Sequence, residues 1–250
     1  MSGSALRVVV VYPDLLGTYG DGGNALVLAR RAAWRDIPVQ LIEATSDGPI
    51  PEGDLYCLGG GEDGPQVRAA EAIRSDGTIV RAVGSGAVVL AVCAGYQIAG
   101  RSFPGADGRA RPGLGLLDVD TVKGEGPRSV GEVVAEPLDG LGDIALPTLT
   151  GFENHGGVTR LGPGVVALAR VTTGNGNGDG SEGARAGRVL GTYLHGPVLA
   201  RNPALADLLL SWAIGSTEPL AALDDGEEEA LRSERLHAVS RSRFTGRARS

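Results

Sequence analysis

The chain has 250 residues, enough for one domain with a full hydrophobic core or for two small domains. Glycine occurs 41 times and proline 14 times, well above their usual joint share of roughly 12%, yet a hydrophobic content of 42% excludes wholesale disorder. The formal net charge of −7 argues against nucleic-acid binding.

The first hundred residues predict strands that alternate with helices. Two apolar runs rich in β-branched residues, Leu6–Tyr12 and Ala87–Val92, are typical of buried strands, and two further strands are predicted over Pro38–Glu43 and Asp54–Leu58. A helix is predicted to follow Asn24, taken as its N-cap, and a second one lies around Pro65–Ser75. This alternation indicates an open, mostly parallel α/β sheet with helices on both faces.

The second half of the chain changes character. Short β-rich pieces separated by glycines extend from Gly113 to Arg170, and we expect Gly174–Gly187 to be a flexible surface loop. A strand over Arg188–Leu194 and a helix starting at Asn202-Pro203 follow. We therefore predict one domain over residues 1–215, with a polar extension over 216–250 that is a fraying helix or disordered.

The cysteine content and the apolar runs limit the class of protein. Two cysteines, Cys57 and Cys93, are too few for a disulfide scaffold or a four-cysteine zinc site, and we expect no bound metal. No apolar run approaches the 18 or so residues of a membrane span. A signal-peptide pattern is also missing, so we expect a cytoplasmic protein.

Cys93 carries the strongest local signal. It follows the strand Ala87–Val92 directly and precedes Ala-Gly-Tyr-Gln97, whose small residues permit a tight turn into a helix. Such an elbow lifts a nucleophile out of a sheet, and the N-terminus of a helix favours the thiolate. The alternative, a buried unreactive cysteine, is the usual one for an isolated residue and is the one we expect for Cys57.

Three histidines could supply a base for this thiol. His195 follows a strand at the carboxyl edge where sites form in open α/β sheets, and His155 lies in the polar turn Gly151–Gly157. His237 lies in the polar extension and is expected to be solvated. The spacing favours His195 as the base, while His155 could instead contact substrate or order a loop.

ATP binding is not expected in this chain. Lys123 is the only lysine, and Gly-Glu follows it, so the sequence holds no GxxxxGK[ST] phosphate-binding loop. The turn Asp21–Asn24 is thereby excluded as a phosphate loop. Three glycines, Gly59–Gly61, end a predicted strand beside that of Cys93; their backbone N–H groups could approach an oxyanion, or they could form an ordinary turn.

Taken together, the motifs resemble those of the class I glutamine amidotransferases, in particular the cobyric-acid-synthase-like (CobB/CobQ-like) branch. Within it they resemble the glutaminase subunits of lipid II isoglutaminyl synthases. The motifs that carry this resemblance lie between about Leu6 and Gly215: Tyr12–Leu16, Tyr19–Asn24, Gly59–Asp63, Cys93–Gln97, Gly151–Gly157 and Gly191–Pro197. The resemblance implies a three-layer, flavodoxin-like fold.

The resemblance also implies an activity. Cys93 would attack the side-chain amide of L-glutamine to give a thioester and ammonia, and His195 would act as general base and acid. The backbone N–H groups of Ala94 and Gly60 would form the oxyanion hole. Gln97 would shape the substrate pocket, and Arg128 would bind the substrate carboxylate. The chain itself would need no cofactor.

A partner subunit is implied as well. Ammonia would pass to a MurT-like Mur ligase that uses ATP and Mg to activate the α-carboxyl of D-glutamate in lipid II, giving D-isoglutamine for peptidoglycan. The two chains would form a heterodimer, reaching lipid II at the inner face of the membrane. Alternatives are a glutaminase that serves another acceptor, such as a corrinoid, a non-catalytic binding module, and a cysteine hydrolase or redox protein.

One position departs from the wider class. Many class I amidotransferases carry a glutamate two residues after the histidine, and here that position is Pro197. The carboxylate that orients His195 must then come from elsewhere in this chain or from the partner subunit. If the partner supplies it, the isolated chain should hydrolyse glutamine slowly, because an unoriented imidazole is a poorer base.

Overall fold

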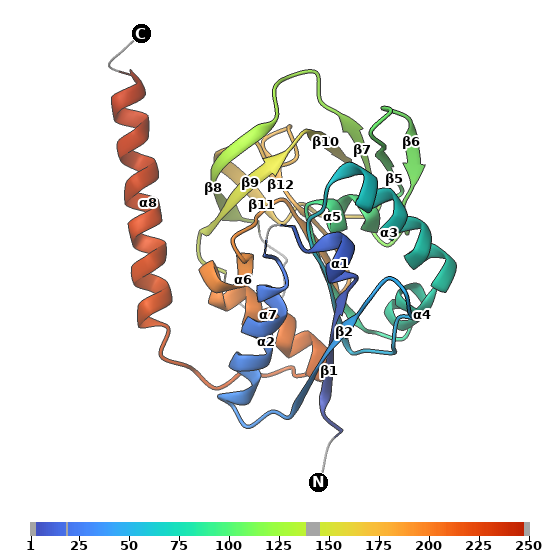
Figure 1. The fold of residues 1–250 in the computed structure, drawn as a ribbon. Helices are drawn as coiled ribbons and strands as arrows, with labels where there is room; N and C mark the ends of the chain where they lie inside the picture. Colours follow the sequence, from blue (N-terminus) through green and yellow to red (C-terminus); the bar gives the residue numbers. More distant parts are fainter. Residues whose placement is uncertain (1–3, 19, 139–145, 248–250) are drawn as a thin grey trace.

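The computed structural model describes residues 4–18, 20–138 and 146–247, with side chains up to 239. Tyr19 and the chain ends therefore lie outside the described residues. The centre is a six-stranded sheet in the order β13-β14-β4-β3-β1-β2, parallel except for β13 (Figure 1). Its strands are β1 (Leu6–Val11), β2 (Val39–Ala44), β3 (Leu55–Leu58), β4 (Val88–Val92), β13 (Ala184–Ala186) and β14 (Val189–Thr192).

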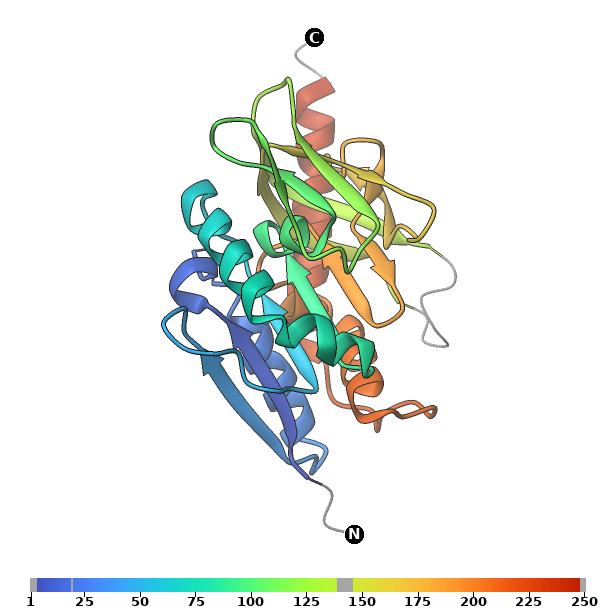
Figure 2. The same ribbon diagram turned by 90° about the vertical axis from the view of Figure 1, so that its right-hand side faces the viewer.

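Helices cover both faces of this sheet, as the sequence predicted (Figure 2). On one face, α2 (Gly23–Ala33) packs on β1 and β2, and α7 (Pro203–Ile214) packs on β4 and α2. On the other, α5 (Ala94–Ala99) contacts β3, β4 and β14, and α3 (Asp63–Asp76) packs on α5. Short helices α1 (Pro13–Leu16), α4 (Thr78–Gly84) and α6 (Val198–Arg201) complete the layers.

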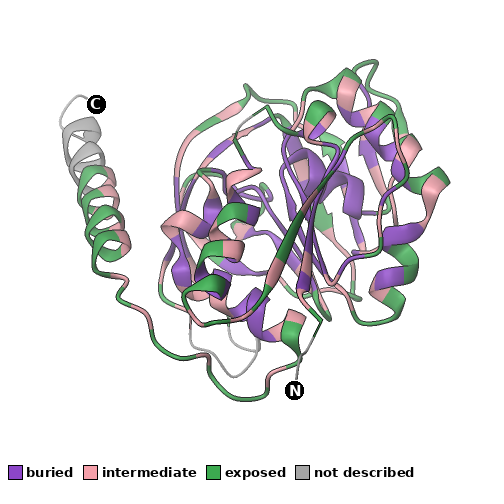
Figure 3. Cartoon of the chain, turned by 60° about the horizontal axis from the view of Figure 1, so that its bottom comes forward, coloured by how far each residue is buried: buried purple, intermediate pink, exposed green. Residues whose placement is uncertain are grey.

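The inner strands β3, β4 and β14 are buried along their whole length, as the purple ribbons in the middle of Figure 3 show, whereas the edge strand β2 is mostly exposed or half-buried. Every residue of β3, β4 and β14 is buried, which explains why these segments are continuous apolar runs rather than alternating ones. The strand order 2-1-3-4-14 is that of a flavodoxin-like sheet, so the predicted three-layer fold is confirmed.

A β-rich lobe sits at the end of the parallel sheet that lies away from the N-terminus (Figures 1 and 2). It consists of two four-stranded sheets in the orders β10-β7-β5-β6 and β12-β11-β8-β9. Their bounds are β5 (Ser102–Pro104), β6 (Ala110–Pro112), β7 (Val119–Lys123), β8 (Ser129–Pro137), β9 (Leu149–His155), β10 (Gly157–Leu161), β11 (Ala169–Thr173) and β12 (Ser181–Glu182). The predicted β-rich second half is thereby confirmed.

The segment Gly174–Gly187 is not a flexible loop, so that prediction was wrong. It contains β12 and β13, and its Asn177 is fully buried, with its side-chain amide donating to Ser181 Oγ and to the Gly183 carbonyl at 2.9 Å each. Glycines at positive φ, such as Gly176 and Gly178, let the backbone fold tightly around this asparagine. Glycine-rich composition resembles a linker, but here the glycines serve tight turns.

Asn24 and Asn202, the asparagines at the predicted starts of two helices, use their side chains for tertiary contacts instead of capping. The helix α2 begins at Gly23 with Gly22 as N-cap, and the Asn24 side chain instead accepts the Leu199 N–H at 3.0 Å, which ties α6 to α2. Asn202 does occupy the N-cap position of α7, but its side chain binds the backbone of Thr150 on β9. Tertiary hydrogen bonds have replaced local capping at both positions.

The polar extension contains the predicted helix, α8 (Gly226–Arg247), which stands beside the main body (Figures 1 and 3). It contacts α6 and β9, and Arg232 donates to the Thr148 carbonyl at 2.6 Å. The segment before it is held by the buried Arg31 of α2, which pairs with Asp207 and Asp225. Among the described residues, no helix is both long and apolar enough to cross a membrane.

Candidate active site

Cys93 sits at a strained turn between β4 and α5. Its backbone has φ of 52° and ψ of −104°, an unfavourable conformation for a non-glycine residue and one typical of a nucleophile elbow. The helix can start immediately because Gly95 packs against β3, where an added Cβ would lie 2.6 Å from the Leu58 carbonyl oxygen. The predicted elbow is therefore present, with a glycine that no other residue can replace without moving β3.

A cavity of about 120 Å³ opens above Cys93. One wall comes from the glycine triplet and the start of α3, and the other from the β lobe. Among its lining residues are Gly61, Asp63, Ala94, Gln97, Lys123 and Arg128. The structure thus brings three of the predicted binding residues, from α5 and from the β7–β8 connection, to the same cavity as the nucleophile.

His195 lies three residues beyond β14, next to the elbow, and its interaction with Cys93 is one of the causes that raise the pKa of its imidazole. Its Nδ1 atom lies 3.0 Å from Oδ2 and 3.2 Å from Oδ1 of Asp21, and both side chains are at most 4% exposed. The carboxylate that Pro197 cannot provide therefore comes from this chain. Cys93, His195 and Asp21 form a nucleophile–base–acid constellation.

Sequence analysis assigns Asp21 no catalytic role, although its turn belongs to the Tyr19–Asn24 motif that carries the family resemblance. A signal was available, since Asp21 lies between β1 and α2, on the carboxyl side of a parallel strand, where sites form. The sequence could not indicate its partner, however, because 174 positions separate Asp21 from His195.

The charge state of His195 follows from its neighbours. Burial lowers the pKa of the imidazole, but the hydrogen bonds and charges of Asp21 and Cys93 outweigh burial and raise this pKa to about 10. At neutral pH the ring is therefore an imidazolium ion next to the sulfur. Such a ring is ready to protonate a leaving group, as an acid–base catalyst for amide cleavage must.

Gly60 does not fit the oxyanion role predicted for it. Its N–H donates to Asp21 Oδ2 at 2.9 Å, and the residue does not line the cavity. The neighbouring Gly61 does line it, so Gly61 replaces Gly60 as the candidate donor. Ala94 lines the cavity as predicted, in the first turn of α5, where N–H groups have no acceptor within the helix.

Gln97 is held rigidly in the cavity wall. Its Oε1 accepts a hydrogen bond of 2.8 Å from Gln66, and its Nε2 donates to the Tyr193 hydroxyl at 3.2 Å. Gly157 fits closely against it, since an added Cβ would lie 2.7 Å from Gln97 Nε2. A side chain fixed from several sides can define the shape of a pocket, which is the role the sequence predicts for Gln97.

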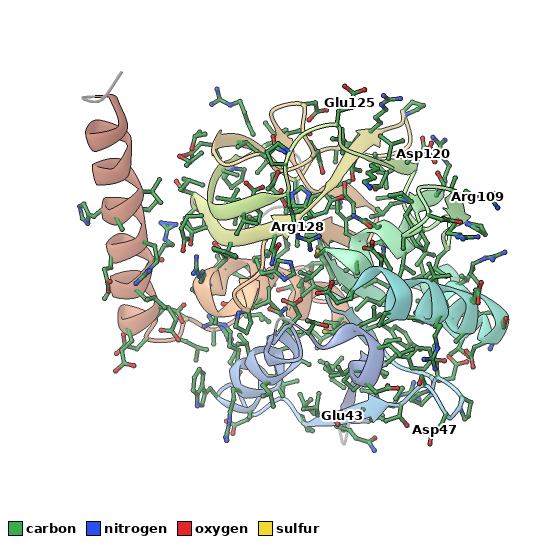
Figure 4. All side chains as sticks on the ribbon, turned by 45° about the horizontal axis from the view of Figure 1, so that its top comes forward. Glu43, Asp47, Arg109, Asp120, Glu125 and Arg128 are labelled. Atoms are coloured by element: carbon green, nitrogen blue, oxygen red, sulfur yellow. The ribbon has the colours of Figure 1, made fainter. Side chains whose placement is uncertain are left out.

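Arg128 reaches the cavity from the loop before β8, beside β9 and near the middle of the molecule (Figure 4). Its Nε donates to Asn154 Oδ1 at 2.6 Å and its Nη2 to the Asn154 carbonyl at 2.9 Å. The same carbonyl lies 3.9 Å from Cys93 Sγ. Asn154 therefore connects the predicted carboxylate-binding arginine with the nucleophile.

His155 lines the same cavity but is not suited to act as the base. Its Nδ1 lies 3.0 Å from the Gly157 carbonyl, and its Nε2 lies 3.4 Å from Glu153 Oε2. Both ring nitrogens therefore already have partners within the β lobe. The ring also stacks on Tyr193 with centroids 3.7 Å apart. Of the two candidates, His195 therefore fits the base.

This assignment makes a testable distinction between the two histidines. We expect His195→Gln to lower kcat for glutamine hydrolysis by about 10²–10⁴-fold, as loss of a general acid–base does. His155→Gln should instead lower the free energy of unfolding by about 1–3 kcal/mol, because Glu153 loses a buried partner, and should leave kcat within about tenfold. Steady-state kinetics measures kcat and urea unfolding measures the stability of each variant. A loss of kcat that is greater in His155→Gln than in His195→Gln would contradict the assignment.

The other candidates lie away from the cavity. Cys57 is in the interior of β3, where burial raises the pKa of its thiol to about 12, in agreement with an unreactive cysteine. His237 is exposed on α8. Among the described residues, no group of three or more His, Cys, Asp or Glu side chains is placed to hold a metal ion.

The sequence of this chain is similar to those of known proteins. A family profile described as the CobB/CobQ-like glutamine amidotransferase domain matches residues 7–203. The chain is 36% identical over 203 residues to "Lipid II isoglutaminyl synthase (glutamine-hydrolyzing) subunit GatD" of Staphylococcus aureus (strain N315), covering 80% of this chain and 81% of that protein. It is 31% identical to the subunit of the same name from Streptococcus pneumoniae (strain ATCC BAA-255 / R6), covering 96% and 94%.

The fold has solved counterparts as well. The structure superimposes on a crystal structure of a glutamine amidotransferase with a TM-score of 0.58 and 23% sequence identity, covering 82% of this chain and 98% of that one. At this level of identity the match bears on the fold alone. It agrees with the strand order and with the placement of Cys93 at the end of a central strand.

Proposed function

This chain belongs to the CobB/CobQ-like glutamine amidotransferase family, and we propose that it is the glutaminase subunit of a lipid II isoglutaminyl synthase. Two relatives that bear this name match it over most of both chains. The observation that carries the chemistry is the Cys93–His195–Asp21 constellation beside the cavity. A non-catalytic binding module is disfavoured, because binding alone does not require a cysteine, a histidine and a carboxylate buried next to one another.

The reaction follows from the positions of these groups. The Cys93 sulfur attacks the side-chain carbonyl carbon of L-glutamine, and the tetrahedral intermediate collapses as the C–N bond breaks. The His195 imidazolium protonates the departing nitrogen, which leaves as ammonia. The neutral ring then takes a proton from water, which attacks the thioester to release glutamate and restore the thiolate. Asp21 holds the ring throughout and stabilises its charged form.

Other cavity residues provide binding and charge stabilisation. In this proposal the N–H groups of Ala94 and Gly61, two residues that line the cavity, receive the oxyanion that develops on the attacked carbonyl. The Arg128 guanidinium, at the mouth, fits the substrate α-carboxylate, with which it can form paired hydrogen bonds. The rigid Gln97 limits the shape of the substrate that can reach Cys93.

A second subunit completes the synthase in this proposal. The relatives are named as subunits, and this sequence has no phosphate-binding loop for ATP. We propose a MurT-like ligase as partner, which binds ATP and Mg and uses the ammonia to amidate the D-glutamate α-carboxyl of lipid II. This would occur in the cytoplasm, at the inner face of the membrane. A corrinoid acceptor is the competing assignment, to be tested with the same complex.

The proposal is tested on the complex of this chain with a MurT-like ligase, supplied with lipid II, ATP and either glutamine or ammonium chloride. The wild type should amidate lipid II with both nitrogen sources. Cys93→Ala should lose amidation with glutamine and keep it with ammonium, because only ammonia production depends on the thiol. Cys57→Ala, the buried control, should keep both. Undiminished glutamine-dependent product from Cys93→Ala would disprove the proposed role of the thiol, and absence of product from the wild type would disprove the lipid II assignment.

A further inference from the structure

The cavity above Cys93 carries charges of both signs near its opening. Lys123 and Arg128 reach it from the two ends of the β7–β8 connection in the β lobe, and Asp63 reaches it from the first turn of α3. Cations and carboxylate therefore come from different walls of one small cavity. The proposed function uses Arg128 alone, which leaves Lys123 and Asp63 unexplained.

The register of β7 directs Lys123 toward the cavity. Alternate residues of a strand point to the same side, and the preceding members of this set, Val119 and Thr121, are buried. Val122, on the other side, is 38% exposed. Lys123 is paired across the sheet with Gly157, which also lines the cavity. The only lysine of the chain therefore ends at the substrate pocket.

Lys123 and Asp63 share one feature of their charges. Among the described residues, no hydrogen bond or ion pair involves the Lys123 ammonium or the Asp63 carboxylate. The exposed Arg101, by contrast, contacts both Asp118 and Asp120. Two opposite charges that face one cavity without partners match a ligand that carries both charges itself.

We propose that Lys123 and Asp63 select free L-glutamine by binding its α-amino-acid group, Lys123 together with Arg128 on the carboxylate and Asp63 on the ammonium. This inference rests on the proposed glutaminase reaction. Because Cys93 must meet the side-chain amide at the closed end of the cavity, the α-carbon and its two charges face the opening. A glutamine residue within a peptide has neither charge and is rejected.

Substrate analogues test each contact separately. Glutaramate is glutamine without the α-ammonium group, and 4-aminobutanamide is glutamine without the α-carboxylate. Ammonia release by the intact complex gives kcat and KM for all three compounds. Lys123→Met should raise KM for glutamine about tenfold with kcat little changed, and should leave kcat/KM for 4-aminobutanamide unaltered. Asp63→Asn should raise KM for glutamine similarly and leave kcat/KM for glutaramate unaltered.

Matched controls separate these effects from general changes in surface charge. Lys123→Arg should restore a KM near that of the wild type, because it keeps the cation. Arg109→Met and Asp47→Asn remove exposed charges at the outer edge of the molecule (Figure 4) and should leave every constant unchanged. If the variants of Lys123 and Asp63 change kcat/KM equally for all three compounds, the two side chains do not bind the α-amino-acid group and the inference is wrong.

The single lysine permits an independent measurement. An amine-reactive acylating reagent can modify only Lys123 and the N-terminus of this chain, and L-glutamate, which keeps both α-charges, should slow the labelling of Lys123 about tenfold at saturation while D-lactate should not. Equal labelling with and without glutamate would overturn the inference. A wild-type complex that releases no ammonia from glutamine would instead refute the proposed function, so the two failures are distinguishable.

Discussion

Replacing Asp21 with asparagine is expected to lower kcat for glutamine hydrolysis by about 10³–10⁴-fold, the range seen when the orienting acid of a catalytic triad is neutralised. Asp21 is 2% exposed and faces His195 Nδ1 at 3.0 Å. A neutral amide removes the negative charge that stabilises the imidazolium. It can also turn its NH₂ group toward Nδ1, which fixes the ring tautomer that cannot take a proton from the sulfur.

The same variant should change the pH dependence in a defined direction. Although burial lowers the pKa of His195, Asp21 and Cys93 raise it to about 10, so the wild type keeps the proton donor through neutral and mildly alkaline pH. In Asp21→Asn the basic limb of the kcat profile should move to lower pH. Since the pKa of His195 in the folded protein lies above the usual histidine value of 6.5, its pairing with Asp21 stabilises the fold below about pH 6.5, and this contribution is lost as the pH rises through 10.

Asp14→Asn is the matched control. This exposed acid lies in the same β1–α2 connection but accepts a hydrogen bond from the Ser46 N–H and does not line the cavity. It should keep the activity of the wild type. If Asp21→Asn retains activity within about tenfold of the wild type, the orienting carboxylate must come from the partner subunit, and the isolated chain should then be far slower than the complex.

Replacing Arg31 with methionine should lower the free energy of unfolding by about 3–5 kcal/mol, the usual result of removing one member of a buried ionic group. The Arg31 side chain is 2% exposed. It donates from Nε and Nη2 to Asp207 and from Nη1 and Nη2 to Asp225. Methionine fills much of the space but leaves these two carboxylates close together without their shared cation.

Urea unfolding of the Arg31 variant measures this loss, and limited proteolysis should show faster cleavage in the segment before α8 that Asp225 anchors. Arg101→Met is the control, because Arg101 also contacts two aspartates but is 52% exposed. Water and salt screen that pair, so its removal should have far less effect. Equal unfolding midpoints for the Arg31 variant and the wild type would contradict the structural importance of this buried group.

Local sequence determines much of what was predicted correctly. The apolar runs of β1, β3 and β4 have no polar face and can be satisfied only as strands buried on both sides. The elbow at Cys93 requires small residues directly after the strand, and the sequence shows them as Ala94 and Gly95. These are contacts between neighbours in the chain, so spacing and composition reveal them.

The errors share one physical cause. Asn24 and Asn177 are short polar side chains in glycine-rich turns, a pattern that suits a helix cap or a linker. In the fold, Asn24 accepts the N–H of Leu199, and Asn177 is buried against Tyr96, whose hydroxyl lies 3.2 Å from its Oδ1. A polar side chain binds whatever group the tertiary structure brings to it, and its own neighbours in sequence do not specify that group.

The sequence by itself determined an open α/β sheet, an elbow cysteine and a histidine at the carboxyl end of a strand. The tertiary structure alone decided that Asp21 orients that histidine, that Gly61 rather than Gly60 faces the cavity, and that both ring nitrogens of His155 have partners in the β lobe. The strand order places β1 two strands from β4, and its following turn meets the end of β14 over the same edge. Charge states and hydrogen-bond partners depend on such distances in space, which the order of residues along the chain does not contain.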